Sequence, residues 1–121
     1  MIHHVSIEAA DLDRSGAFYD AVLGQLGWRR HADSGQGVGW GIARPEFFVL
    51  PSDAPRPGSG HVCFPAMGIP AVKAAWQEGL ENGGTDEGRP GARPQYGTGY
   101  YSAYLRDPDG HRIEIAVGAR R

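Results

Sequence analysis

The chain has 121 residues, of which 12 are basic and 14 acidic, so its formal net charge is −2. This balance excludes the strongly basic surface typical of nucleic-acid-binding proteins. No apolar run approaches the roughly 18 residues of a membrane span, and the start lacks the pattern of a signal peptide. The single cysteine, Cys63, fits a reducing compartment, so we expect one cytoplasmic domain over residues 1–121.

The sequence repeats itself when residue 4 is aligned with residue 61. The order of apolar, amphipathic and glycine positions is kept in both copies, which indicates a duplicated supersecondary unit. We place unit one at about 1–52, a Pro- and Gly-rich linker at 53–60, and unit two at about 61–118. The identical pairs are His4 and His61, Val5 and Val62, Ala17 and Ala74, Leu23 and Leu80, and Gly27 and Gly84.

Unit one begins with alternating residues at 3–8, which predict a strand. Its apolar side carries Val5 and Ile7, and its other side carries His4, Ser6 and Glu8. A helix should follow, capped by Asp13 and ending near Gly24 or Gly27. Two short apolar runs, 37–43 and 47–50, predict further strands. The expected apolar stripe of the helix is Ala17, Phe18, Val22 and Leu23.

Unit two follows the same order, starting with a strand at 61–65. Pro70 suits the first turn of the next helix, and the Asn-Gly-Gly run at 82–84 should end it. Residues 85–99 are rich in Pro and Gly and are expected to form a long loop. Strands are predicted at 100–106 and 112–117. The expected helical stripe is Val72, Ala75, Trp76 and Leu80.

The turn between the last two strands, residues 107–110, reads Asp-Pro-Asp-Gly. This is the chemistry of a three-residue hairpin loop with Gly110 in the left-handed conformation. The register then places Tyr104 opposite Glu114. One face of the hairpin carries Tyr100, Ser102, Tyr104, Glu114 and Ala116; the other, more apolar face carries Ala103, Leu105, Ile113 and Ile115.

His4, His61 and Glu114 are candidate metal ligands, because two imidazoles and a carboxylate on strands suit several divalent metals. A lone strand histidine is more often a surface residue, but His4 and His61 occupy equivalent places in the two copies. Glu114 lies between Ile113 and Ile115, so its alternative is simple exposure on the sheet. His3 is given no role, and His31 and His111 are expected to be solvated.

The opening I-H-H-V-S-I, the helix A-A-D-L-D-R-S-G-A-F-Y-D-A-V-L and the ending R-D-P-D-G-H-R-I-E resemble the vicinal oxygen chelate superfamily. This superfamily includes glyoxalase I, bleomycin- and fosfomycin-resistance proteins and extradiol dioxygenases. The resemblance covers nearly the whole chain. It implies an α+β fold in which two tandem βαβββ units form a curved, cup-like mixed sheet, but one such scaffold hosts many reactions.

The resemblance places the superfamily's first-strand ligands at His4 and His61 and its last-strand glutamate at Glu114. The fourth carboxylate ligand of glyoxalase I would fall at Phe48, with Glu46 two positions away, so the set is His-His-Glu. The stretch from Tyr104 to Glu114 resembles the motif of extradiol dioxygenases. Their additional histidine is missing, however, because residues 95–99 read Gln-Tyr-Gly-Thr-Gly.

The resemblance implies a glyoxalase-like lyase or isomerase, dependent on one divalent ion (Zn, Ni, Fe, Mn or Co), that acts on a small oxygenated molecule. Tyr104 would hydrogen-bond the substrate, and Tyr100 is a further catalytic candidate. A homodimer is expected, with the units pairing within a chain or swapping between chains. The candidate substrate-binding residues are Trp40, Phe48, Ser6, Ser102 and Arg93.

Two alternatives stay open: a sequestering protein of bleomycin-resistance type and, second to it, an extradiol-type dioxygenase. The metal-free sequestering protein would use an aromatic groove formed by Trp40, Phe47, Phe48 and Tyr100. A fosfomycin-type site would need basic residues, and the nearby Arg89, Arg93 and Arg106 are better interpreted as solvated loop or edge charges.

Overall fold

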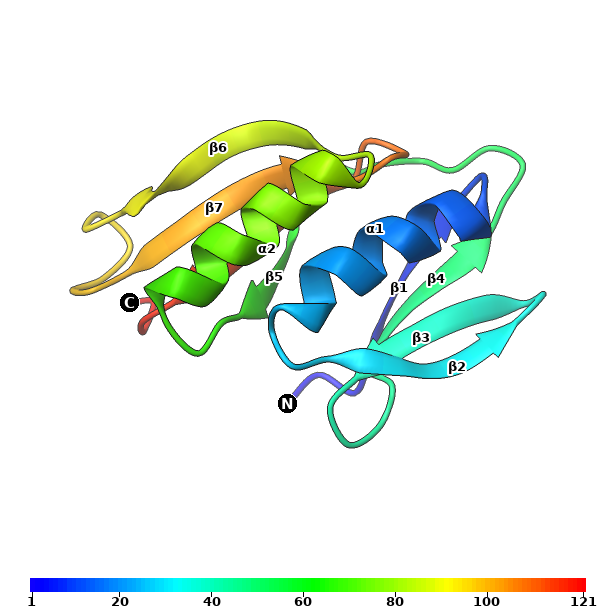
Figure 1. Ribbon diagram of the computed structural model, residues 1–121, viewed down its shortest axis with the longest axis horizontal. Helices are drawn as coiled ribbons and strands as arrows, with labels where there is room; N and C mark the ends of the chain where they lie inside the picture. Colours follow the sequence, from blue (N-terminus) through cyan, green and yellow to red (C-terminus); the bar gives the residue numbers. More distant parts are fainter.

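The computed structural model describes residues 1–121, and its two halves repeat one order of elements (Figure 1). Each half contains a strand, a helix and three further strands, as the sequence and its resemblance predict. The first half comprises β1 (Val5–Ala9), α1 (Leu12–Gly24), β2 (Arg29–Ser34), β3 (Gly37–Gly41) and β4 (Phe47–Pro51). The second half comprises β5 (Val62–Pro65), α2 (Ile69–Glu81), β6 (Thr85–Ala92), β7 (Tyr101–Arg106) and β8 (Arg112–Val117).

The eight strands form two mixed, four-stranded sheets. Their strand orders, β1-β4-β3-β2 and β5-β8-β7-β6, are equivalent under the duplication. In each sheet the first and last strands of the unit run parallel, and the other neighbours run antiparallel. The α+β class is therefore confirmed. Neither helix is both long and apolar enough to cross a membrane.

The prediction of a loop over 85–99 is wrong in its first half, where β6 pairs with β7. Gly88, Pro90 and Gly91 disguise this strand in the sequence, since these residues usually interrupt strands. The structure accommodates them at two register shifts, where bulges break the regular ladder. Strand β2 was also not predicted from the sequence. It is a polar strand at the edge of its sheet, so the apolar alternation that marks a strand is weak there.

Helix α1 begins earlier than the sequence predicted, because Asp11 and not Asp13 is its N-cap. The Oδ1 of Asp11 accepts hydrogen bonds from the backbone N–H groups of Asp13 and Arg14 at 3.0 and 3.1 Å. Ala17, predicted to lie in the stripe, is exposed, and Tyr19 is buried in its place. The helix ends at Gly24 as expected. Helix α2 also has the predicted Pro in its first turn and Asn82 at its C-cap.

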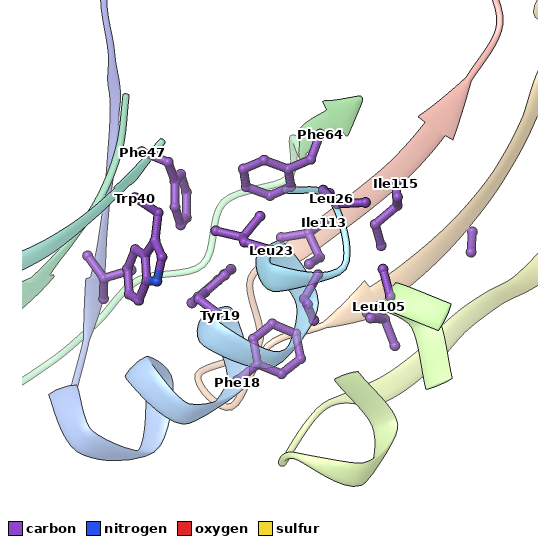
Figure 2. Packing of buried hydrophobic residues seen from close by; sticks show 14 of the residues in the cluster. Phe18, Tyr19, Leu23, Leu26, Trp40, Phe47, Phe64, Leu105, Ile113 and Ile115 are labelled. Atoms are coloured by element: carbon purple, nitrogen blue, oxygen red, sulfur yellow. The ribbon is translucent and has the colours of Figure 1, made fainter. Parts of the chain in front are cut away.

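One hydrophobic core joins the two halves. Helices α1 and α2 lie side by side in Figure 1. In Figure 2, Tyr19 and Leu23 of α1 lie between Phe47 of the first sheet and Ile113 of the second. The hairpin residues predicted to be apolar and inward, Ala103, Leu105, Ile113 and Ile115, are all buried in this core. The opposite face of the second sheet therefore points away from both helices.

The β7–β8 turn of the second half is hydrogen-bonded to the start of α1 in the first half. Asp109 Oδ1 accepts from the Ala10 N–H at 3.2 Å and from the Arg14 guanidinium at 3.0 Å, and its Oδ2 accepts from the Ser15 hydroxyl at 3.1 Å. The side chain of Asp109 is only 3% exposed. Gly110 has a φ of 90°, the left-handed conformation predicted for this turn. The turn thus holds the two halves in one arrangement.

Two buried polar contacts reinforce this junction. The Tyr19 hydroxyl donates to Asp107 Oδ2 at 2.6 Å, and His111 Nε2 lies 2.6 Å from the carbonyl oxygen of Glu8. The prediction that His111 is solvated is wrong, because its side chain closes the gap between the two halves and is buried. His31 is half-buried and likewise bonded, with Nε2 at 2.9 Å from the carbonyl oxygen of Ile42.

Removing the Asp109 carboxylate should destabilise the whole domain. Asp109→Ala removes an acceptor shared by three donors, so we expect a loss of about 2 kcal/mol in the free energy of unfolding. Asp53→Ala, in the exposed linker, is the matched control and should change little. Urea denaturation measures both. Equal stability of Asp109→Ala and the control would contradict a junction held by this turn.

Tyr19 should make stability sensitive to alkaline pH. Burial first, and the charge of Asp107 second, raise the pKa of Tyr19 well above its usual value. The folded state therefore keeps the phenol proton where the unfolded chain releases it, so this contribution is complete below about pH 10 and declines as the pH rises further. The stability difference between wild type and Tyr19→Phe should shrink above that pH.

Denaturation curves at several pH values measure this difference. Tyr101→Phe, which removes a hydroxyl that makes no hydrogen bond within the protein, is the control. A difference between wild type and Tyr19→Phe that does not vary with pH would contradict the prediction.

Candidate metal and ligand site

The face of the second sheet that points away from the core gathers most of the predicted site residues. The register pairs Glu114 with Tyr104 on one side and with Cys63 on the other, and both pairs are direct neighbours. The Tyr104–Glu114 pairing is the one predicted from the turn sequence. We call this surface the Glu114 face; it comprises His61, Cys63, Arg93, Tyr100, Ser102, Tyr104, Arg112, Glu114 and Ala116.

Glu114 is at the centre of this face and is only 1% exposed. Its Oε1 lies 2.9 Å from His61 Nε2, and its Oε2 accepts a hydrogen bond from the Tyr100 hydroxyl at 2.7 Å. Burial by itself raises the pKa of Glu114, but the hydroxyl and imidazole groups around it outweigh burial, and the net pKa is lowered. Glu114 is therefore a buried, ionised carboxylate, and the alternative of simple exposure on the sheet is excluded.

The two tyrosines of the face are proton donors at neutral pH. Burial first raises the pKa of Tyr104 to about 12, and the charge of Glu114 adds to this effect. Burial and the hydrogen bond to Glu114 raise the pKa of Tyr100 further. A phenol that keeps its proton can donate a hydrogen bond but does not act as a base. A role as general base is therefore not supported for Tyr100, the further catalytic candidate of the sequence analysis.

Cys63 is a member of the face that the sequence analysis did not select. Although its side chain is partly exposed, burial of its sulfur, followed by the charge of Glu114, raises the pKa of the Cys63 thiol to about 12. The thiol thus stays protonated at neutral pH and is a poor nucleophile. The strand alternation could have revealed it, since Cys63 lies two residues from His61 on the same side of β5.

Two arginines lie over the ring of Tyr104. The guanidinium carbon of Arg112 is 4.3 Å from the ring centre and that of Arg93 is 5.2 Å away, both within the range of cation–π contact. Arg93 also donates from Nε to the Ser102 hydroxyl at 2.7 Å. The sequence analysis selected Arg93 and Ser102 but not Arg112, which precedes Glu114 by two residues and so shares its face.

The first half places His4 in a different environment. His4 is exposed, its Nδ1 lies 2.8 Å from His3 Nδ1, and its ring centre is 5.6 Å from that of Phe48. Ser6 pairs with Phe48 just as Cys63 pairs with Glu114. Phe48 thus occupies in the first half the position that Glu114 occupies in the second half. Only the second half has a hydrogen-bonded contact between a histidine and the glutamate of its last strand.

Among the remaining candidates, Ser6 and Phe48 lie with His4 at a hollow of about 410 Å³ on the first half. Trp40 does not reach either face. Its indole is 1% exposed in the core, and its Nε1 donates to Asp20 Oδ1 at 2.8 Å. Trp40, which the sequence analysis proposed for substrate binding and for an aromatic groove, therefore stabilises the core instead.

The donor set suits a divalent ion in part. His61 and Glu114 supply a nitrogen and an oxygen that already lie together, and an ionised, buried carboxylate favours a cation. No group of three or more His, Cys, Asp and Glu side chains in one chain is arranged to hold a metal ion. His4, the third expected ligand, borders a hollow of about 390 Å³ together with His61, but it does not join His61 and Glu114 in such a group.

Comparison with known proteins supports the resemblance. The family model of the Glyoxalase/Bleomycin resistance protein/Dioxygenase superfamily matches residues 1–115. The chain belongs to this superfamily. No curated protein matches the sequence of this superfamily member.

Solved structures of the superfamily share its fold. A glyoxalase/bleomycin resistance protein from Albidiferax ferrireducens T118 is 31% identical, with a TM-score of 0.83 over 96% of this chain and 97% of that one. A lactoylglutathione lyase from Agrobacterium tumefaciens is 27% identical, with a TM-score of 0.70 over 98% and 93%. The fosfomycin resistance protein FosX from Mesorhizobium loti is 16% identical, with a TM-score of 0.71 over 96% and 90%, and shows the fold alone.

Proposed function

We propose that this superfamily member is a divalent-metal-dependent, glyoxalase-like enzyme of lyase or isomerase type that acts on a small oxygenated molecule. The observation that carries the proposal is the buried, ionised Glu114 bonded to His61, which is exposed. An ionised carboxylate is costly to bury, so its retention beside an imidazole favours a cationic ligand. The relatedness to a lactoylglutathione lyase is consistent with this class of reaction.

A second copy of the chain would complete the ligand set. His4 is exposed and lies on the half in which Phe48 takes the place of the glutamate, and His61 with Glu114 lacks a third ligand. In a two-fold symmetric dimer, the first half of one copy can face the second half of the other, and the two sites are then equivalent. We therefore propose a homodimer in which His4 of one copy joins His61 and Glu114 of its partner.

A divalent ion held by His4, His61 and Glu114 would polarise vicinal oxygens of a bound substrate. The remaining residues of the Glu114 face have separable tasks. The hydroxyl of Tyr100 orients the carboxylate of Glu114 through their 2.7 Å hydrogen bond. The phenol of Tyr104, whose pKa is raised to about 12, keeps its proton and can donate to a substrate oxygen.

Metal binding tests the proposed ligand set. Purified wild type should hold about one divalent ion per chain, and His4→Ala, His61→Ala and Glu114→Gln should each lower the affinity by about 100-fold, because each removes a direct ligand. Elemental analysis and titration with Zn²⁺ measure the change. His31→Ala is the control, because the His31 ring forms hydrogen bonds only with the backbone oxygens of Gly41 and Ile42. Unchanged metal affinity in His61→Ala would exclude the assignment.

Subunit mixing tests the dimer. His4→Ala and Glu114→Gln copies, each without metal, are unfolded and refolded together. If ligands come from two copies, half of the mixed dimers' sites are intact, and random pairing restores about a quarter of the wild-type metal content. If all three ligands come from one chain, the mixture stays as empty as its components, and the proposed exchange of ligands is wrong.

A sequestering protein of bleomycin-resistance type is the second candidate. The observation that favours it is the 410 Å³ hollow beside His4, whose walls include Phe48 and the exposed Leu50. Such a protein would hold an amphipathic ligand without converting it. Tight ligand binding that persists in Glu114→Gln, with no turnover of α-hydroxycarbonyl or epoxide substrates, would favour this function.

A further inference from the structure

We infer that Arg44 and His3 are positioning residues that fix the ring proton of His4 on Nε2. In this state His4 offers no free ring nitrogen, so it can accept a metal ion only after the contact between Arg44 and His3 opens. The inference rests on the function proposed above, in which His4 is a metal ligand, and it concerns two residues outside the proposed ligand set.

Two hydrogen bonds join the three residues. The Nη1 of Arg44 lies 3.3 Å from His3 Nε2, and His3 Nδ1 lies 2.8 Å from His4 Nδ1. No acidic side chain forms an ion pair with Arg44, so none competes with His3 for the guanidinium. His3 is therefore bonded through both of its ring nitrogens.

The direction of these bonds follows from what each group can donate. A guanidinium only donates, so His3 Nε2 must be an unprotonated acceptor, and the single proton of a neutral His3 lies on Nδ1. This Nδ1–H donates to His4 Nδ1, which must therefore accept. The ring proton of His4 then lies on Nε2. No other placement of protons on two neutral imidazoles satisfies both contacts.

The orientation of the His4 ring is supported from two sides. Its plane is at 80° to the ring of His3, with the ring centres 5.0 Å apart, and at 85° to the ring of Phe48, with the centres 5.6 Å apart. Such edge-to-face arrangements are favourable for aromatic rings. Turning the His4 ring to exchange its two nitrogens would break these contacts, so they favour the present orientation.

His4 in this state has no lone pair left for a cation. A metal-bound imidazole gives one nitrogen to the metal and keeps its proton on the other. To free Nε2, the His4 Nε2 proton must leave to solvent, His4 Nδ1 must take the Nδ1 proton of His3, and His3 Nε2 must take a proton from solvent. The number of protons is unchanged.

Arg44 opposes this rearrangement. Once His3 Nε2 carries a proton, it faces the N–H of the guanidinium, and two donors cannot bond to each other. The contact between Arg44 and His3 must therefore open before His4 Nε2 is free. Solvent can exchange the protons, because His3, His4 and Arg44 all border one hollow of about 410 Å³.

Proton positions in the metal-free protein test the inference directly. Long-range ¹H–¹⁵N correlation spectra, recorded at about pH 8 where imidazoles are neutral, should show His3 protonated on Nδ1 and His4 on Nε2. Arg44→Met removes the donor and should shift the His3 proton toward Nε2 and the His4 proton toward Nδ1. Arg44→Lys keeps a donor and the charge, so it should retain the wild-type pattern.

Titration with Zn²⁺ measures the consequence for His4. Arg44→Met should raise the Zn²⁺ affinity by about tenfold, because no hydrogen bond to a charged donor has to be broken. In a His3→Ala background the same substitution should change the affinity by less than about twofold, since Arg44 acts through His3. Arg29→Met, which removes a charge from the exposed edge of the first sheet, is the matched control and should also have an effect below about twofold.

Three results would overturn the inference: a His3 proton on Nε2 in the wild type, unchanged proton positions in Arg44→Met, or an equal gain in Zn²⁺ affinity from Arg44→Met with and without His3. The last result would mean that Arg44 acts only by charge repulsion. The proposed function fails separately. A wild type that takes up no Zn²⁺ would refute the metal-dependent enzyme, while the spectra still decide the proton positions of His3 and His4.

Discussion

The shared core around α1 is the constraint on which the rest of the structure depends. A half of about 50 to 60 residues has a marginal core of its own, and in the structure the two halves share one cluster (Figure 2). Tyr19 and Leu23 lie where residues of both sheets meet. Because this interface uses the helix side of the second sheet, the opposite side is left for the Glu114 face.

The polar junction fixes the arrangement that the core allows. Apolar packing is non-directional, whereas the hydrogen bonds of Asp109 with α1 and of Tyr19 with Asp107 hold only in one geometry. The turn that makes these contacts also connects β7 to β8, the strands that carry Tyr104 and Glu114. One short segment thus sets the register of the candidate site and docks the second half onto the first.

The two halves keep the same backbone plan but differ in chemistry. Phe48 and Glu114 occupy equivalent positions, so the first half presents a histidine beside an apolar ring and the second presents a histidine beside a carboxylate. A duplicated fold would otherwise offer two equal sites. For this reason the proposed ligand set combines His4 of the first half with His61 and Glu114 of the second.

Much of the fold could be predicted from the sequence, because local rules govern it. The Asp-Pro-Asp-Gly turn determines its own hairpin and hence the pairing of Tyr104 with Glu114, and strand alternation assigns Leu105 and Ile113 to the core. Strand β6 was not predicted, because its Gly and Pro residues do not favour a strand locally. Pairing with β7 keeps this segment extended.

What only the tertiary structure decided is the environment of single side chains. The sequence determined that His4, His61 and Glu114 are ligand candidates, whereas the structure joins His61 with Glu114 and leaves His4 at the edge of a hollow that it shares with His61. It also moved Trp40 into the core, His111 into the junction and Arg112 onto the Tyr104 ring. Strand alternation identifies the face on which a residue lies, whereas burial, charge and hydrogen bonding depend on the elements packed against that face.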